Sequence, residues 1–341
     1  MVLTGIRAMA LEELPTPCIA GDDEVLLRMA RVGVCGSDVH YYLEGRIGEQ
    51  IVRYPFPVGH ECSAVVREVG DAVTRVKPGD LVAVDPAIAC HACDQCRAGR
   101  AHTCRNLRFL GCPGQAPGCL SEFIVMPETC CYPVPDTVGL SQAALVEPLS
   151  VGIYAVSRSV PMTGTAIAIL GAGPIGLSVL LAARAAGVGR VYVTDKISER
   201  LAAAKANGAH WAGNPDTDPI VEPIAQAEPR LLDAVFECCG EQEALDQAIR
   251  LLRPGGKLMV VGIPTVSRVS FDVDATRRNE LCIQNVRRQN ECVQPAIDLI
   301  AGGEIDAEFM VTHEFEFARA RDAFELVADY RDGVIKAIIT M

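Results

Sequence analysis

The sequence predicts an α/β fold with two domains, one β-rich and the other a doubly wound parallel sheet. Up to about Ser150 the chain reads as short strands and turns, with strand-like runs at Glu24–Arg31 and Ala64–Val69. After Ser150, short apolar runs alternate with helix-type runs, a pattern typical of a parallel sheet covered by helices on both faces. The 341 residues are also more than one small core needs.

The alternating part begins with an apolar strand at Ala166–Leu170 and a helix at Ile175–Ala186. A second strand follows at Val191–Thr194, and Ser198 is expected to cap the next helix. The later elements are expected at Ala234–Glu237 (strand), Gln242–Leu252 (helix), Pro254–Gly256 (turn), Leu258–Val261 and Leu281–Val286 (strands), Val293–Ile300 and Ala318–Ala328 (helices), and Val334–Ile339 (strand).

Composition excludes several classes of protein. Half of the residues are hydrophobic, which excludes a disordered chain, and the net charge of −12 is the wrong sign for nucleic acid as the main partner. The uncharged run Ser159–Ala183 is long enough to cross a bilayer, but its glycines and prolines divide it into a strand and a helix, so no membrane segment is expected. Met1–Glu13 has no signal-peptide pattern, and a cytoplasmic location is the expectation.

The loop Gly171-Ala172-Gly173-Pro174-Ile175-Gly176 fits the G-x-G-x-x-G pattern between a predicted strand and a predicted helix. Gly171 permits a tight turn, Gly173 lets the backbone approach a pyrophosphate, and Gly176 lets helix and strand pack closely. Asp195 lies 19 residues beyond Gly176, where a ribose-binding carboxylate is expected. A carboxylate there repels a 2′-phosphate, so the pattern favours NAD over NADP.

Four of the 15 cysteines crowd into one loop, at Cys90, Cys93, Cys96 and Cys104. Four thiolates at this spacing can close a tetrahedral zinc shell of the structural kind. An iron–sulfur cluster is the chemical rival, but its bacterial spacing ends in x3-Cys-Pro, whereas here the last gap is seven residues. Cys35 and His60-Glu61 could supply a catalytic zinc site with one open position, although spacing alone leaves open whether they meet.

Together these motifs resemble the zinc-containing medium-chain dehydrogenases, in particular their sorbitol (polyol) dehydrogenase branch. The resemblance spans nearly the whole chain. The matching segments are Val32–Tyr41, Glu44–Gly48, Gly59–Glu61, the four-cysteine loop, Glu147–Gly152 and Gly171–Gly176. It implies a GroES-like catalytic domain formed by residues 1–152 and 287–341 around a Rossmann NAD-binding domain of residues 153–286.

The resemblance also implies roles for single residues. Cys35, His60 and Glu61 would bind a catalytic zinc, with Glu147 as an alternating ligand or nearby base, so that each subunit holds two zinc ions. Ser37 and His40 would carry the proton of the alcohol towards solvent. Residues expected around NAD, besides the glycine loop and Asp195, are Arg200, Val261, Ile263 and Val286. Residues expected around the substrate are Tyr41, Phe109, Arg287 and Arg288.

The expected substrate is a polyol oxidised at a secondary hydroxyl, and one departure keeps a sugar acid open beside it. The polyol branch has Phe-Arg-Tyr where this chain has Arg287-Arg288-Gln289, so a tyrosine is missing and a cation is added. Arginine binds carboxylates well, which fits a hexonate 5-dehydrogenase. An enzyme of the 2,3-butanediol or threonine type is a further alternative. Family members imply a homotetramer or dimer.

Two readings from other classes are less favoured. A nucleotide-sensing protein that had lost the chemistry would lack catalytic ligands, and none is missing. A zinc-ribbon nucleic-acid binder would need a basic face around Cys90–Cys104, which the net charge of −12 opposes. The ten cysteines without a metal role are expected to be small apolar filler.

Overall fold

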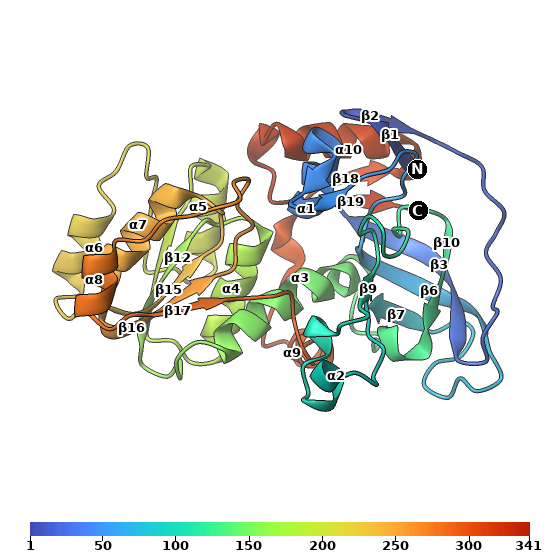
Figure 1. The fold of residues 1–341 in the computed structure, drawn as a ribbon, viewed down its shortest axis with the longest axis horizontal. Helices are drawn as coiled ribbons and strands as arrows, with labels where there is room; N and C mark the ends of the chain where they lie inside the picture. The colour runs from blue at the N-terminus through green and yellow to red at the C-terminus, as the bar shows by residue number, and fades with distance from the viewer. The chain divides into compact units, whose positions relative to one another are not determined.

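The computed structural model describes all 341 residues, which form two compact units (Figure 1). The first unit comprises Met1–Glu147 and Val293–Met341, and the second comprises Pro148–Cys292. The sequence predicts domain boundaries between residues 152 and 153 and between residues 286 and 287. The long helix α3 (Leu140–Ser157), which sequence reading did not anticipate, carries the chain from the first unit into the second.

The first unit is built on a seven-stranded sheet in which β3 is the central strand. The strand order is β11-β7-β6-β3-β19-β18, and β10 pairs with β3 beside β19. These strands are β3 (Glu24–Gly33), β6 (Glu61–Val69), β7 (Leu81–Val84), β10 (Phe123–Pro127), β11 (Cys131–Pro133), β18 (Val311–Glu316) and β19 (Lys336–Thr340). The last strand of the chain thus completes a sheet that begins near the N-terminus, which places residues 293–341 in this unit.

Smaller elements surround this sheet. They are β1 (Val2–Gly5), β2 (Ala8–Ala10), α1 (Gly36–Glu44), β4 (Arg46–Ile47), β5 (Gln50–Ile51), β8 (Ala87–Ile88), α2 (Asp94–Arg97), β9 (Arg108–Phe109), α9 (Val293–Ala301) and α10 (Ala320–Ala328). Helix α1 packs on α10, where the rings of Tyr42 and Phe324 lie edge to face at 5.6 Å. Both side chains are fully buried, so this pair anchors α1 to the C-terminal segment.

The second unit is a six-stranded parallel sheet with the order β14-β13-β12-β15-β16-β17. Its strands are β12 (Ala166–Leu170), β13 (Arg190–Thr194), β14 (Trp211–Gly213), β15 (Leu232–Glu237), β16 (Leu252–Val260) and β17 (Cys282–Asn285). Its helices are α4 (Pro174–Ala185), α5 (Ser198–Ala206), α6 (Val221–Ala227), α7 (Gln242–Leu251) and α8 (Val273–Arg278). The predicted doubly wound sheet is confirmed, and β12 lies beside the point where the strand order reverses.

Two local expectations are wrong. Ser198 is the first residue of α5, and Ile197 occupies the capping position. The Asp195 carboxylate instead accepts a hydrogen bond from the Ile197 backbone N–H at 2.9 Å, which fixes the approach to the helix. The expected turn at Pro254–Gly256 lies inside β16, where the pairing with β15 shifts register and Gly255 has a φ of 71°.

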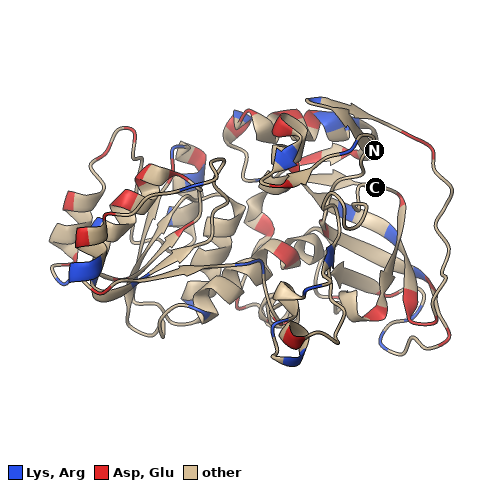
Figure 2. Cartoon of the chain, in the orientation of Figure 1, with Lys and Arg blue, Asp and Glu red and all other residues tan.

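Residues 159–183 form β12 and most of α4, and no helix is long and apolar enough to cross a membrane. Acidic and basic residues are interspersed over both units in the view of Figure 2. All 15 cysteines are free. Ten cysteines were expected to be small apolar filler, and six of them are buried. Cys18, Cys239 and Cys282 are exposed, so packing in a core does not explain them.

Candidate active site and metal centres

The register of β3 and β6 brings the candidate metal ligands of the first unit together. Gly33, the last residue of β3, is paired with Glu61, the first residue of β6. Cys35 follows β3 by two residues and occupies the N-cap of α1, while His60 immediately precedes β6. The ligand atoms of Cys35, His60 and Glu61 consequently lie within 4.8 Å of one another. The question that spacing left open is answered, because these three side chains do meet.

The third strand at this point is β19, which contributes Lys336. Its ammonium lies 2.5 Å from Glu61 Oε2 and donates to the Val34 carbonyl at 3.1 Å, and both charged side chains are buried. Burial lowers the pKa of Lys336, but Glu61 and Cys35 oppose this and raise it overall. Glu61 Oε1 is the oxygen left free of the ion pair. Sequence reasoning missed Lys336, because its partner is 275 residues away.

Only glycine fits at position 33. A Cβ on Gly33 would lie 2.5 Å from Glu61 Oε2, so a side chain there would displace the carboxylate. The backbone of β3 can therefore approach Glu61 closely enough for both strands to present their ends to the same point.

His60 is oriented by Asp38, a residue of α1 to which sequence reasoning gave no role. His60 Nδ1 lies 3.3 Å from Asp38 Oδ1, which also accepts from the Gly59 backbone N–H at 3.3 Å. Burial lowers the pKa of His60, yet Asp38 and Cys35 raise it well above its usual value. A carboxylate holding one ring nitrogen is the usual partner of a metal-binding histidine and leaves Nε2 for the metal. In the sequence, the signal for this role was that Asp38 lies two residues before His40.

Helix α1 also presents the residues expected to carry a proton. Ser37 Oγ donates to Cys35 Sγ at 3.3 Å, and His40 follows one helical turn later on the same face. His40 Nδ1 lies 3.8 Å from Glu44 Oε1, and the His40 side chain is 26% exposed, so it borders solvent. Ser37 therefore touches a candidate metal ligand while His40 reaches outwards.

Glu147 lies in α3 and is buried, but it is not one of the three converging ligands. Its pKa is raised to about 7: burial disfavours the carboxylate, Glu61 adds to this effect, and His60 and Lys336 oppose it. These influences show that Glu147 feels the charges of the candidate site.

The expected substrate residues occupy different surroundings. The buried ring of Phe109 lies 5.4 Å from the His60 ring. The Tyr41 hydroxyl donates to Gln50 Oε1 at 3.1 Å and lies 3.9 Å from Cys112 Sγ. Arg287 and Arg288 follow β17 in the second unit; Arg287 is exposed, and Arg288 is half-buried with a φ of 54°.

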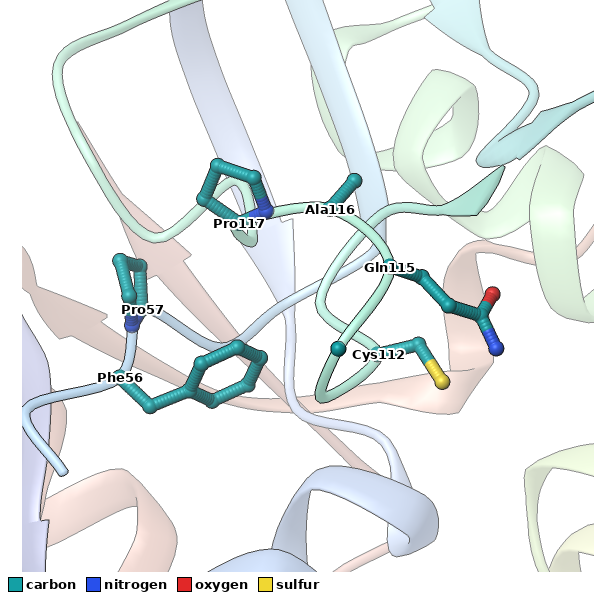
Figure 3. Close-up of a pocket in the computed structure, with 7 residues that line it drawn as sticks. Phe56, Pro57, Cys112, Gln115, Ala116 and Pro117 are labelled. Carbon is teal, nitrogen blue, oxygen red and sulfur yellow. The ribbon is translucent and has the colours of Figure 1, made fainter. Parts of the chain in front are cut away.

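A cavity of about 290 Å³ opens near Cys112 (Figure 3). Phe56 and Pro57 form one side, and the loop from Cys112 to Pro117 forms the other. None of the candidate metal ligands lines this cavity. It is therefore a neighbour of the Tyr41 hydroxyl and not the metal site itself.

The four-cysteine loop also converges, with all four sulfur atoms within 4.8 Å of one another. The Cys90–Cys104, Cys93–Cys96 and Cys93–Cys104 sulfur pairs lie 3.4, 3.6 and 3.8 Å apart. Tetrahedral zinc with Zn–S bonds of about 2.3 Å sets sulfur atoms about 3.8 Å apart. The donors fit one zinc ion, and they lie closer together than a multi-iron cluster would hold them.

Local contacts and burial shift the pKa values of two of these cysteines in opposite directions. The Ala92 backbone N–H, with the Cys104 thiol, lowers the pKa of Cys90 to about 6, whereas desolvation raises that of Cys96 to about 12. Arg105 closes the loop through two hydrogen bonds to Asp94, at 2.5 and 2.8 Å.

The glycine loop of the second unit shows the backbone that a dinucleotide requires. Gly171 has a φ of 98°, and a Cβ on Gly176 would lie 1.8 Å from the Gly171 carbonyl oxygen. Gly173 caps α4, and Pro174 is the first helical residue, followed by Ile175. The helix N-terminus thereby offers its free N–H groups to an anion.

Charged residues border this loop. Asp195 follows β13, and its Oδ2 accepts from the Ala172 backbone N–H at 2.7 Å. Arg200 is buried, with Nη1 3.6 Å from where a Gly173 Cβ would lie. Both predicted residues therefore lie against the predicted loop.

Glu237 at the end of β15 is a site residue that sequence reasoning missed. Its Oε1 accepts from the backbone N–H groups of Cys239 at 2.7 Å and Gly240 at 2.5 Å. Its carbonyl accepts from Val261 at 2.8 Å and Gly262 at 2.9 Å. Glu237 thus ties together the loops after β15 and β16, where Val261 and the half-exposed Ile263 lie. An acid ending an apolar strand was the available signal.

Val286, another residue expected around NAD, directly follows β17. Its backbone N–H donates to the Val260 carbonyl at 2.9 Å. It therefore lies at the same carboxyl edge of the sheet as Val261.

Comparison with known proteins agrees with this geometry. Residues 21–136 match the family model described as alcohol dehydrogenase GroES-like domain, and residues 174–302 match zinc-binding dehydrogenase. The chain is 36% identical over 339 residues to a sorbitol dehydrogenase of Bacillus subtilis, covering 99% of this chain and 96% of that protein. The chain belongs to the zinc-containing medium-chain alcohol dehydrogenases.

Other relatives within this dehydrogenase family carry different names. An L-idonate 5-dehydrogenase of Vitis vinifera is 34% identical over 96% of this chain and 90% of its own. A crystal structure of an Escherichia coli dehydrogenase of unknown specificity has a TM-score of 0.94 and 32% identity, covering 99% of this chain and 97% of that one. The medium-chain dehydrogenase is thus a zinc-binding enzyme that uses a nicotinamide cofactor.

Metal analysis of single variants should distinguish the two cysteine-containing sites. Cys35→Ser and Cys93→Ser are each expected to lower the zinc content by about one equivalent per chain, because each removes a thiolate from a different ligand set. Cys35→Ser should abolish dehydrogenase activity, while Cys93→Ser should chiefly lower the melting temperature. Elemental analysis, activity and thermal unfolding check this. Full zinc content in either variant would contradict the corresponding site.

Asp195 should control the choice of cofactor. Asp195→Ala is expected to weaken NADH binding about tenfold and to reduce discrimination against NADPH, because a charge-bearing hydrogen-bond acceptor is lost. Asp195→Asn is the matched variant, since its amide oxygen can still accept from Ala172. Fluorescence titration with both cofactors measures the preference. A preference unchanged in both variants would show that Asp195 does not face the ribose.

Proposed function

We propose that this enzyme oxidises a secondary hydroxyl of a polyol, of the sorbitol or xylitol kind, to a ketose and transfers the hydride to NAD. The convergence of Cys35, His60 and Glu61 within 4.8 Å carries the proposal. The full-length similarity to a sorbitol dehydrogenase supports the substrate class.

The residues of α1 and β6 divide the chemistry between them. The catalytic zinc would be held by Cys35, His60 and Glu61. Glu147 would act as an alternating ligand or as a base. When bound, zinc supplies a Lewis acid that lowers the pKa of the substrate hydroxyl. Ser37 Oγ accepts the hydroxyl proton as it gives up its own, and His40 at the solvent border passes that proton on. The carbon hydrogen leaves as hydride, so the products are a ketone, NADH and one proton.

The cofactor and assembly belong to the same proposal. Gly171–Gly176 binds the pyrophosphate, and Asp195 and Arg200 bind the adenosine end of NAD. The backbone at Val261, Ile263 and Val286 flanks the nicotinamide. The four-cysteine loop holds a second, structural zinc. The enzyme works in the cytoplasm as a homotetramer or dimer, as its resemblance to other family members implies.

A substrate panel tests the activity. NADH formation from sorbitol, xylitol and 2,3-butanediol is expected to be fastest with the polyols, to be weak when NADP replaces NAD, and to be lost after zinc chelation. Restoring activity by adding zinc back is the control for chelator damage. The absence of NAD-linked oxidation with every secondary alcohol would refute the proposal.

A sugar acid is the second candidate, favoured by the exposed cation Arg287 beside Arg288. The relative named L-idonate 5-dehydrogenase supports the same class. If Arg287 and Arg288 together bind a carboxylate, Arg287→Ala should lower kcat/KM for L-idonate about tenfold or more while leaving sorbitol unchanged. Steady-state kinetics on both substrates measure this. An equal ratio in wild type and variant would remove the sugar acid as the substrate.

A further inference from the structure

The second unit contains a charged cleft at the edge of its sheet opposite the glycine loop. The cleft has a volume of about 510 Å³. Its lining residues come from the segments that lead into β12 and β15, from the first residues of β12, β13 and β15, and from β16. Ala166 begins β12, whereas Gly171 follows its other end. Five residues of strand, about 16 Å at 3.3 Å per residue, separate the two edges. The cleft is therefore distinct from the dinucleotide loop.

The two acids of this cleft are held by the fold. Asp233 Oδ2 accepts from the Ala166 backbone N–H at 3.0 Å, and its Oδ1 accepts from Arg253 Nε at 2.8 Å. Glu228 Oε1 accepts from Arg190 Nη1 at 3.0 Å and from the Tyr192 hydroxyl at 2.8 Å. The two carboxylates therefore bind a backbone N–H group at the start of β12, a tyrosine hydroxyl and two of the three arginines of the cleft.

The third arginine of the lining, Arg230, has no acidic partner. It is exposed and takes part in no ion pair or side-chain hydrogen bond of the protein. Its charge nevertheless reaches the cleft. Burial raises the pKa of Asp233, but the Ala166 backbone N–H, Arg253 and, least, Arg230 lower it overall. Leu231, with a φ of 62°, makes the turn that brings the chain from Arg230 into β15. Three arginines against two acids leave one net positive charge.

We propose that this cleft binds a phosphate monoester of a small polar molecule. Arg190, Arg230 and Arg253 come from three different segments, and each guanidinium group retains donors that the acids do not use. A tetrahedral phosphate can accept from several directions, whereas one guanidinium fork satisfies a planar carboxylate. The volume lies within the range of small-molecule sites, so the cleft has room for the esterified molecule beside the phosphate.

Calorimetry on the full-length enzyme saturated with NADH tests the site, because the cofactor then fills the pyrophosphate loop. Glycerol 3-phosphate is expected to bind saturably with one site per chain, inorganic phosphate more weakly, and glycerol not at all. No saturable binding of glycerol 3-phosphate would overturn the proposal. Equal affinity for glycerol 3-phosphate and inorganic phosphate would overturn the assignment to an ester.

Two charge-matched variants locate the binding. Arg230→Gln is expected to weaken glycerol 3-phosphate binding about tenfold or more, because a hydrogen-bonded charge is lost. Lys205→Gln removes the same charge from α5, outside the cleft, and should change affinity by no more than about twofold. Both residues are exposed, so both variants should fold, and thermal unfolding verifies this. Equal effects of the two substitutions would overturn the assignment to this cleft.

Discussion

The buried ion pair between Lys336 and Glu61 is the interaction on which the first unit depends. Removing two charges from water is costly, and the cost is offset only when the partners meet in good geometry. The pair forms only if β3, β6 and β19 are all in register, because Gly33 of β3 must leave room for the carboxylate between them. The same register sets Cys35 and His60 beside Glu61. One electrostatic constraint thus aligns the strands and assembles the candidate metal ligands.

Local signals in the sequence predicted those parts of the structure whose residues are close in the chain. The apolar run Ala166–Leu170 and the glycine and proline residues after it predicted β12 with its observed bounds and α4 within one residue. The four thiols of the cysteine loop converge because their spacing is short. The helix cap at Ser198 was wrong because a more distant carboxylate, Asp195, already holds that backbone.

Contacts over long sequence distances escaped prediction for a physical reason. Periodicity and spacing report local geometry, whereas Lys336 reaches Glu61 only through strand pairing. Asp38 reaches His60 only because α1 begins just after the end of β3, which pairs with the start of β6. Only the family resemblance predicted that Cys35, His60 and Glu61 share one site. Glu237 was missed because its partners are backbone N–H groups, so only its place at the end of an apolar strand pointed to a role. Side chains that position others are therefore harder to find than the ligands they support.

The place of β19 at the end of the chain has a consequence for synthesis on the ribosome. Domains generally fold as units while the chain emerges. The second unit is continuous from Pro148 to Cys292, so all its strands are present before the C-terminal segment is made. The first unit must wait, with β3 lacking part of its edge and Glu61 lacking its cation, until Lys336 has been translated. The unit that carries the metal ligands is thus begun before the second unit and completed after it.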